Sequence, residues 1–463
     1  MLRRLLCLAA AVAVVVVFLA PPATSQVPAN SDPQAAFPLC GPEGVPHIPL
    51  PADLSGTPDR IEDPQMAFPL CGPKGVPHIP LPADLSGTLD GIEYKIRVPA
   101  NWNGALLLYA HETGAAGVEV APPTSATSPT LEEQLLSLGY ALAGSQHELS
   151  LKQGPRRILE LTQFFYREVG RPARTIVWGM SAGGDITLAL IERHPEIFDG
   201  AIPVAAEAGG WPNYADFLLR YDLAYAAAFG WPTDWWGPVE DLRDDLFGNE
   251  ATLIMPVFQW ASQTNYGQWE FIRLVMKESP KAWWESDFPG WMFCGWAGTA
   301  VRSGLEQEYG GPVSQNVGAF YSLTAEEKAY LSTLGVDADP LLTWMNAHTD
   351  IVADRRARHQ LAHYGTPNGN LHRPVVMMQG IFDPIVVPSN DAVYGDLVED
   401  RGKGHELVQV YVDTWHGPFS AEQYLAALAA MEHWLETGVR PGTSFFPESL
   451  GFDNNFVPPP WPY

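Results

Sequence analysis

The chain has 463 residues, of which 46% are apolar, so it is long enough for one large domain with an insertion or for two domains. Its formal net charge of −26 makes nucleic acids and anionic membrane surfaces poor partners, and we expect it to bind neither. We attribute the acidity to solubility, because nothing in it selects a cationic ligand.

Residues 1–25 are typical of a secretory signal peptide. Two arginines precede an apolar run over residues 5–20, and small residues at 23–25 offer a cleavage site just before Gln26. An uncleaved membrane anchor is the alternative, although the run is rather short for a membrane span. We therefore predict a secreted, extracellular protein with no stable membrane association after signal cleavage.

A tandem repeat of 31 residues follows, with copies at 32–62 and 63–93. The copies differ only at the position pairs 35/66, 43/74, 58/89 and 60/91, which indicates a recent duplication. Because the unit is rich in proline and glycine, which disfavour regular ladders, residues 26–90 are predicted to form an extended N-terminal arm. A small binding or tethering repeat is the alternative.

From residue 91 onward, strand and helix patterns alternate. The strand patterns cover Ile92–Val98, Ala105–Ala110, Tyr140–Ala143, Arg174–Trp178 and Gly200–Ala205, and the helical patterns cover Leu131–Leu138, Pro155–Val169 and Ala182–His194. Repeated β-then-α units imply a mostly parallel sheet flanked by helices on both faces. We assign residues 91–207 to the first part of this α/β core.

Residues 208–372 break the pattern, with eleven of the sixteen tryptophans, helical fragments and no strong strand series. The α/β pattern resumes over 373–441, with strands at Val375–Met378 and Glu406–Val412 and helices at Pro388–Val398 and Ala421–Leu435. A Trp-rich, mainly helical cap is therefore predicted to interrupt the core. We expect most of its tryptophans to pack inside the cap and a few to line a pocket. The Pro-rich tail, 442–463, is expected on the surface.

The first candidate for chemistry is Ser181 in the run Gly179-Met180-Ser181-Ala182-Gly183, which lies between a predicted strand and a predicted helix. A strand, GxSxG and a helix in this order are typical of a nucleophilic serine on a sharp turn, where flanking glycines avoid clashes. We predict that Ser181 is the nucleophile. A Gly-rich packing turn is the alternative.

A nucleophilic serine needs a base, which in this kind of site is a histidine that follows the serine and the acid in the chain. His416 follows the strand ELVQVYVDTW, at a carboxyl end where sites in open α/β sheets lie. His405 precedes the same strand and His433 falls in the middle of a helix, so both are less suitable. His416 is the predicted base.

The acid that orients the histidine should follow the preceding strand. Asp383 lies there, in VVMMQGIFDPIVVPSN, and we predict that it is this acid; a turn or helix-cap role is the alternative. Glu207, after an earlier strand, is the second choice. Asp391 and Asp396 fall in the next helix and are expected to face solvent.

The oxyanion of the reaction needs two backbone donors. We expect the N–H of Ala182 to be one of them. The other should come from the loop after the 105–110 strand, with Thr113 as first choice and Glu112 as second. The ring of His111 is expected to brace this loop.

These segments resemble the α/β-hydrolase superfamily. The resemblance rests on LLLYAHETG, WGMSAGG with TLALIERHPEIFDGAIPV, QGIFDPIVVPSN and DTWHGPF, in the family's order and spacing over 91–207 and 373–441. It is strongest to secreted bacterial members with a cap inserted before the acid, and it implies a serine hydrolase that carries Ser181, Asp383 and His416. One departure is Glu112, where many members have glycine.

Three cysteines remain after signal cleavage: Cys40, Cys71 and Cys294. Because the second repeat copy is the one joined to the core, we predict a Cys71–Cys294 disulfide; a Cys40–Cys71 bridge is the rival. No cysteine has metal-ligand spacing. His359 and His363 stand four apart, but Gln360 replaces the glutamate of HExxH, so we predict no metal and no cofactor.

The pattern as a whole predicts a secreted serine hydrolase that cleaves a small-molecule or polymeric carboxylic ester through an acyl-enzyme intermediate. A serine peptidase of the same fold is the nearest alternative. A catalytically silent binding protein on this fold is the alternative from another class.

Overall fold

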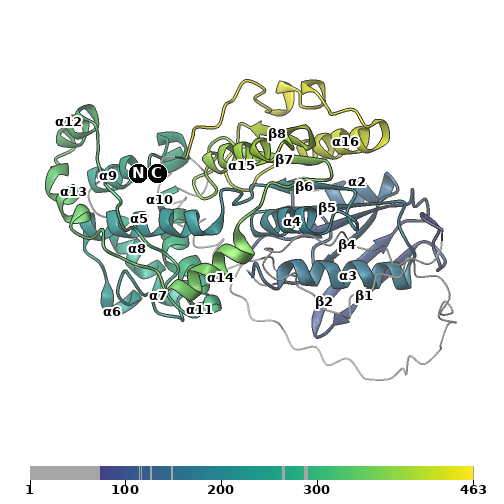
Figure 1. Ribbon diagram of the computed structural model, residues 1–463, viewed down its shortest axis with the longest axis horizontal. Coiled ribbons are helices and arrows are strands. Elements are labelled where there is room, and N and C mark those ends of the chain that lie inside the picture. Colours follow the sequence, from purple (N-terminus) through teal and green to yellow (C-terminus); the bar gives the residue numbers. More distant parts are fainter. Residues whose placement is uncertain are drawn as a thin grey trace.

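The computed structural model describes residues 73–113, 115, 117–125, 128–147, 150–262, 266–285 and 290–461. The predicted signal peptide, the first repeat copy, Cys40 and Cys71 lie outside these residues. Figure 1 shows a sheet with helices on either side of it, next to a second body made of helices alone.

The sheet has eight strands in the order β1-β2-β4-β3-β5-β6-β7-β8. Their bounds are β1 Ala83–Leu89, β2 Ile92–Val98, β3 Ala105–Ala110, β4 Ala141–Ser145, β5 Arg174–Met180, β6 Gly200–Val204, β7 Val375–Gly380 and β8 Leu407–Val412. The β1–β2 and β2–β4 pairs are antiparallel, and all the others are parallel. This arrangement confirms the predicted mostly parallel sheet.

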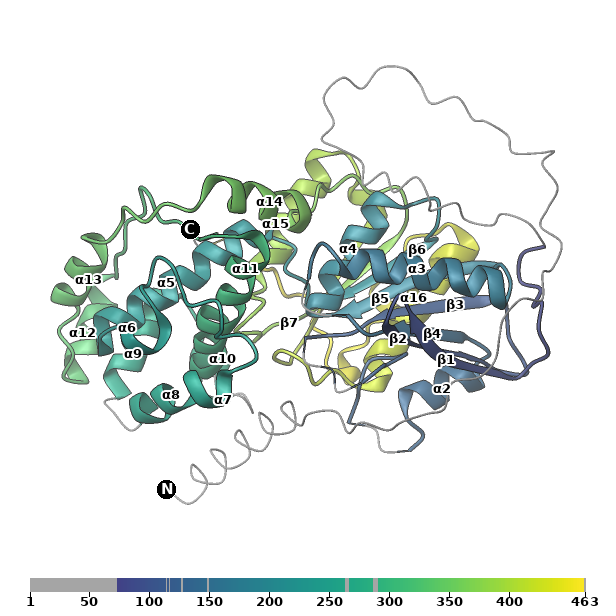
Figure 2. The same cartoon turned by 90° about the horizontal axis from the view of Figure 1, so that it is seen from below.

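Helices cover both faces of the sheet, as the turned view in Figure 2 also shows. The core helices are α2 Leu131–Ser137, α3 Gly154–Glu168, α4 Ala182–Arg193, α15 Ser389–Asp400 and α16 Ala421–Thr437. Apolar residues of α3, α4 and α15 share one buried cluster with the sheet, and those of α2 and α16 share another. Side chains alternate between the two faces of a strand, so β5 sends Val177 to the first cluster and Trp178 to the second.

The second repeat copy is not wholly an extended arm, because its last residues form the edge strand β1. The predicted core boundary at residue 91 therefore falls inside a hairpin. Asp90 and Gly91 make its two-residue turn, with φ values of 48° and 80°, and Leu89 pairs with Ile92. Two positive φ values in an Asp-Gly pair are typical of a type I′ turn. The stretch ADLSGTL contains no proline, and its strand propensity was obscured by the proline-rich residues before it.

Replacing Gly91 with arginine is expected to lower the free energy of unfolding by about 1–3 kcal/mol, because a residue with a Cβ is strained at this φ. A Cβ placed at Gly91 meets nothing within 4 Å, so backbone strain is the cause and not a clash. Urea unfolding of the two proteins measures the difference. Asp90→Asn is the control and should change little, because asparagine tolerates the left-handed region. Equal stability of Gly91→Arg and the original chain would contradict the expectation.

The cap lies between β6 and β7, and its regular elements within the described residues are helices. They are α5 Trp211–Phe229, α6 Thr233–Trp236, α7 Glu250–Leu253, α8 Met255–Ser262, α9 Tyr266–Val275, η1 Lys281–Glu285, α10 Gly290–Trp296, η2 Ala297–Val301, α11 Arg302–Tyr309, α12 Ala325–Thr333, α13 Ala338–Asn346 and α14 Arg355–Gly365. The cap has its own apolar cluster, in which Trp211, Trp236, Trp269, Trp283 and Trp291 are buried. Four more, which are partly buried, pack against this cluster: Trp231, Trp284, Trp296 and Trp344. Most of the cap tryptophans therefore pack within the cap, as expected.

The C-terminal tail lies mostly at the predicted surface, but two of its residues are buried. Phe446 and Phe452 are 2% and 3% exposed and pack with the cluster under α16. A backbone bridge joins Phe452 to Val412 at the edge of β8. Two aromatic side chains thus hold the tail against the sheet, although prolines surround them in sequence.

None of the described helices is both long and apolar enough to cross a membrane.

Candidate active site

Ser181 occupies a strained turn between β5 and α4. Its backbone has φ 54° and ψ −124°, outside the regions that residues with a Cβ favour. The strain is maintained by close packing: a Cβ at Gly179 would collide with the carbonyl of Gly183, and one at Gly183 would collide with the carbonyl of Ala110. The two glycines of the motif are therefore required by close backbone approach.

Three predicted residues from distant parts of the sequence meet at this turn. His416 Nε2 lies 3.1 Å from Ser181 Oγ, and His416 Nδ1 lies 2.7 Å from Asp383 Oδ2. Asp383 follows β7 and His416 follows β8, so both loops leave the carboxyl edge of the sheet. The arrangement forms a continuous hydrogen-bonded line of carboxylate, imidazole and hydroxyl.

The Asp383 carboxylate is held on both oxygens. Its Oδ1 accepts the N–H groups of Ile385 and Val386, each at 2.9 Å, and its Oδ2 accepts the amide of Gln379 at 3.3 Å as well as His416. These donors orient the side chain, which is fully buried, toward the imidazole.

The imidazole of His416 is 9% exposed. Burial lowers its pKa, but the charge of Asp383 and the hydrogen bond to it outweigh this effect, so the pKa of His416 is raised above its ordinary value. The more distant charges of Glu112 and Asp185 act in the same direction. The site therefore favours the imidazolium form more than water does.

Two more carboxyl groups lie near Asp383. Glu207, the second-choice acid, is 3% exposed, and burial together with Asp185 and Asp383 raises its pKa well above the ordinary range. Asp391 is fully buried, and burial and the charge of Asp383 raise its pKa in the same way. The expectation that Asp391 faces solvent is therefore wrong: its side of α15 faces the protein interior. Their burial favours the neutral acid in both groups. The carboxylate that accepts the hydrogen bond of His416 is Asp383.

A chain of hydrogen bonds fixes the loop after β3. His147 N–H donates to His111 Nε2 at 3.0 Å, which leaves the proton on Nδ1 for the carbonyl of Glu112 at 2.7 Å. The buried hydroxyl of Tyr109 donates to Glu112 Oε2 at 2.7 Å. The His111 ring thus braces the loop, and burial lowers its pKa, which favours the neutral form that this hydrogen-bond pattern requires.

The orientation of this loop distinguishes its two candidate donors. The carbonyl of His111 lies against Gly183 of α4, so the N–H of the same peptide unit, which belongs to Glu112, points away from that helix. This geometry favours Thr113 over Glu112 as the second oxyanion donor. Ala182 is the first residue of α4, so no preceding turn of the helix supplies a carbonyl for its N–H, which is therefore suited to bind an anion.

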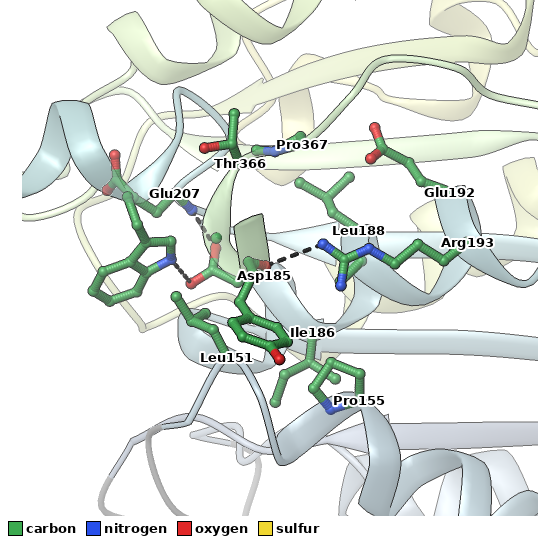
Figure 3. A pocket seen from close by; sticks show the side chains of 14 residues that line it. Leu151, Pro155, Asp185, Ile186, Leu188, Glu192, Arg193, Glu207, Thr366 and Pro367 are labelled. Carbon is green, nitrogen blue, oxygen red and sulfur yellow. Dashed lines mark hydrogen bonds between the residues drawn. The ribbon is translucent and has the colours of Figure 1, made fainter. Parts of the chain in front are cut away.

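A pocket lies where the core joins the cap, one helical turn beyond Ser181 (Figure 3). Asp185 accepts the N–H of Glu207 at 2.6 Å and the indole N–H of Trp211 at 3.2 Å. Arg193 donates to the carbonyls of His363 and Tyr364 at the end of α14. Both segments that connect the core to the cap are thus hydrogen-bonded to α4. The pocket lining includes none of Ser181, Asp383 and His416.

The predicted disulfide is not present at Cys294. This cysteine is a free, buried thiol whose S–H donates to the carbonyl of Pro384 at 3.1 Å. Its predicted partner, Cys71, lies outside the described residues. Among the residues that the structure describes, no group of three histidine, cysteine or acidic side chains is arranged to hold a metal ion.

No protein-family model matches this chain. A curated relative, the o-phthalyl amidase of Xanthobacter agilis, is 30% identical over 405 residues, which cover 76% of this chain and 86% of that protein. With the strand order and the serine turn already established, this relative decides the family. The chain belongs to the α/β-hydrolase superfamily.

Solved structures give weaker likenesses. Feruloyl esterase B from Aspergillus oryzae is 16% identical, with a TM-score of 0.37, and the match covers 77% of this chain and 80% of that one. The acylaminoacyl peptidase of Pyrococcus horikoshii is 11% identical, with a TM-score of 0.40, and the match covers 80% of this chain and 43% of that one.

Proposed function

We propose that this α/β-hydrolase is a serine hydrolase that cleaves carboxylic esters through an acyl-enzyme intermediate. The hydrogen-bonded line from Asp383 through His416 to Ser181 carries the proposal, with distances of 2.7 Å and 3.1 Å. Such a line is what activation of a serine hydroxyl requires.

In the proposed reaction, His416 Nε2 takes the proton of Ser181 as Oγ attacks the carbonyl carbon. The N–H groups of Ala182 and Thr113 hold the negative oxygen of the tetrahedral intermediate. His416 then gives its proton to the departing alkoxide, which leaves an acyl-serine. Water attacks this ester with His416 as base, and a carboxylic acid and free Ser181 result. Asp383 keeps the Nδ1–H tautomer of His416 throughout.

Amide cleavage is the second candidate. It is favoured by the relative of 30% identity, whose name describes an o-phthalyl amidase. An amine leaves only with a proton, so amide cleavage depends on the same imidazolium of His416. A serine peptidase and a catalytically inactive binding protein are the remaining alternatives.

A fluorophosphonate probe should label the purified protein covalently, and absence of labelling would overturn the proposal. A second assay compares p-nitrophenyl esters with p-nitroanilides of the same acids and includes an o-phthalyl amide. We expect kcat/KM to be higher for esters. Faster cleavage of the anilides or of the o-phthalyl amide would replace the ester assignment with amide hydrolysis while leaving the serine mechanism intact.

We also propose that the protein is exported, on the basis of the residues before Gln26. Sequencing the N-terminus of protein collected from the culture medium tests this. A mature chain that begins near Gln26 is expected, and retention of the intact chain in the cell would contradict it.

A further inference from the structure

The cap contacts the loops that carry both Asp383 and His416. Lys281 of η1 lies 2.7 Å from Asp413, three residues before His416, and its Nζ is 3.7 Å from the centre of the Phe382 ring, beside Asp383. One side chain of the cap thus connects the two loops.

Helix α10 packs on the loop of the acid. Its Cys294 donates to the carbonyl of Pro384, and a Cβ placed at Gly290 would lie 2.9 Å from Pro384 Cβ. The residues after Pro384, Ile385 to Val387, belong to the apolar cluster of the cap. The position of α10 relative to Asp383 and His416 is therefore determined by close packing.

This packing places the ring of Phe293 at His416. The two ring centres are 6.1 Å apart, with an angle of 68° between the planes, and the ring of Trp415 is 6.2 Å from Phe293. Phe293 is only half-buried, although Met292 and Cys294 on either side of it are 6% and 1% exposed. Trp296, three residues further along the same helix face, is half-buried too.

We propose that Phe293 and Trp415 form the subsite for the leaving group and that this subsite takes a flat aromatic group. The inference rests on the proposed function. His416 must give its proton to the leaving oxygen or nitrogen, so that atom lies within hydrogen-bond distance of Nε2. A ring attached to it through one carbon reaches the aromatic side chains beside His416, and aromatic rings pair favourably at such separations.

The test compares benzyl and methyl esters of acetic acid, because the two leaving alkoxides have similar basicity and differ mainly in the ring. In Phe293→Ala, kcat/KM is expected to fall about tenfold for the benzyl ester, which corresponds to about 1.4 kcal/mol, and less than about twofold for the methyl ester. Most of the loss should appear in KM. Phe293→Leu keeps most of the apolar volume and should show a smaller loss, again for the benzyl ester more than for the methyl ester. This second variant provides the test if Phe293→Ala does not fold.

Phe320→Ala is the matched control, since Phe320 is an exposed cap phenylalanine at 78% exposure, and it should change neither ester. Equal losses on the two esters in both Phe293 variants would overturn the subsite, because they would mean that the ring only supports His416. A changed preference between methyl acetate and methyl butyrate would overturn it as well, because the ring would then lie on the acyl side. Failure of the original protein to cleave any ester or to react with the fluorophosphonate would instead reject the proposed function, and the subsite with it.

Discussion

Replacing Ser181 with alanine is expected to lower kcat on the best ester by about 10⁶-fold and to abolish labelling by the fluorophosphonate. In the proposed mechanism this hydroxyl forms the acyl-enzyme, and an alanine methyl group cannot form that bond. Alanine removes a single oxygen and keeps a Cβ on the strained backbone, so the turn between β5 and α4 is retained.

The measurement is kcat for the ester together with intact-protein mass after exposure to the probe. Ser137→Ala provides the control, because Ser137 is an exposed serine on α2 whose hydroxyl bonds only to its own helix, and it should react like the original chain. Probe labelling that persists in Ser181→Ala would show that another residue is the nucleophile.

Replacing Asp383 with asparagine is expected to lower kcat by about 10⁴-fold, because an amide can donate to Nδ1 and hold His416 in the wrong tautomer. The pH profile should change as well. His416 acts as a base only when it is neutral, so kcat/KM rises as the pH passes through the pKa of His416. In the original chain this rise is expected at a pH above the ordinary pKa of histidine. Removing the negative charge of Asp383 lowers the pKa of His416 and moves the rise to lower pH.

Glu207→Gln and Asp391→Asn are the controls for Asp383→Asn. Burial is the main cause that raises the pKa of each carboxyl and favours its neutral form, so replacement by a neutral amide should change kcat by less than about tenfold. A loss in Glu207→Gln as large as that in Asp383→Asn would show that Glu207 is the acid that orients His416.

The positions of the site residues in the sequence explain why most of them could be predicted. Ser181 lies between a strand and a helix that the local pattern identifies, and the carboxyl ends of β7 and β8 limit the choices for Asp383 and His416. The burial of Asp391 could not be predicted, because residues within one helix do not reveal which face packs against a loop eight residues earlier. Phe293 had no signal at all, since only the packing of α10 on Pro384 brings it to His416.

The β1–β2 hairpin was missed for a different reason, because its local sequence does contain a signal. Its Asp-Gly turn is a strong local signal, but the composition of the whole repeat outweighed it. The tail shows the same effect: its prolines correctly indicate a segment that lies mostly at the surface, but they give no sign that Phe446 and Phe452 pack inside. Composition averaged over a segment hides the few residues that decide its position.

The hairpin also has a consequence for how this gene can change. Leu89, the last residue of β1, and Gly91 of the turn correspond to Pro58 and Arg60 in the first copy, so only the second copy carries the glycine that this turn uses. When recombination between tandem copies deletes one unit, the surviving unit keeps its downstream end from the second copy unless the exchange falls within the last few residues. The number of repeats can therefore grow or shrink over generations while the strand that joins the sheet is inherited intact.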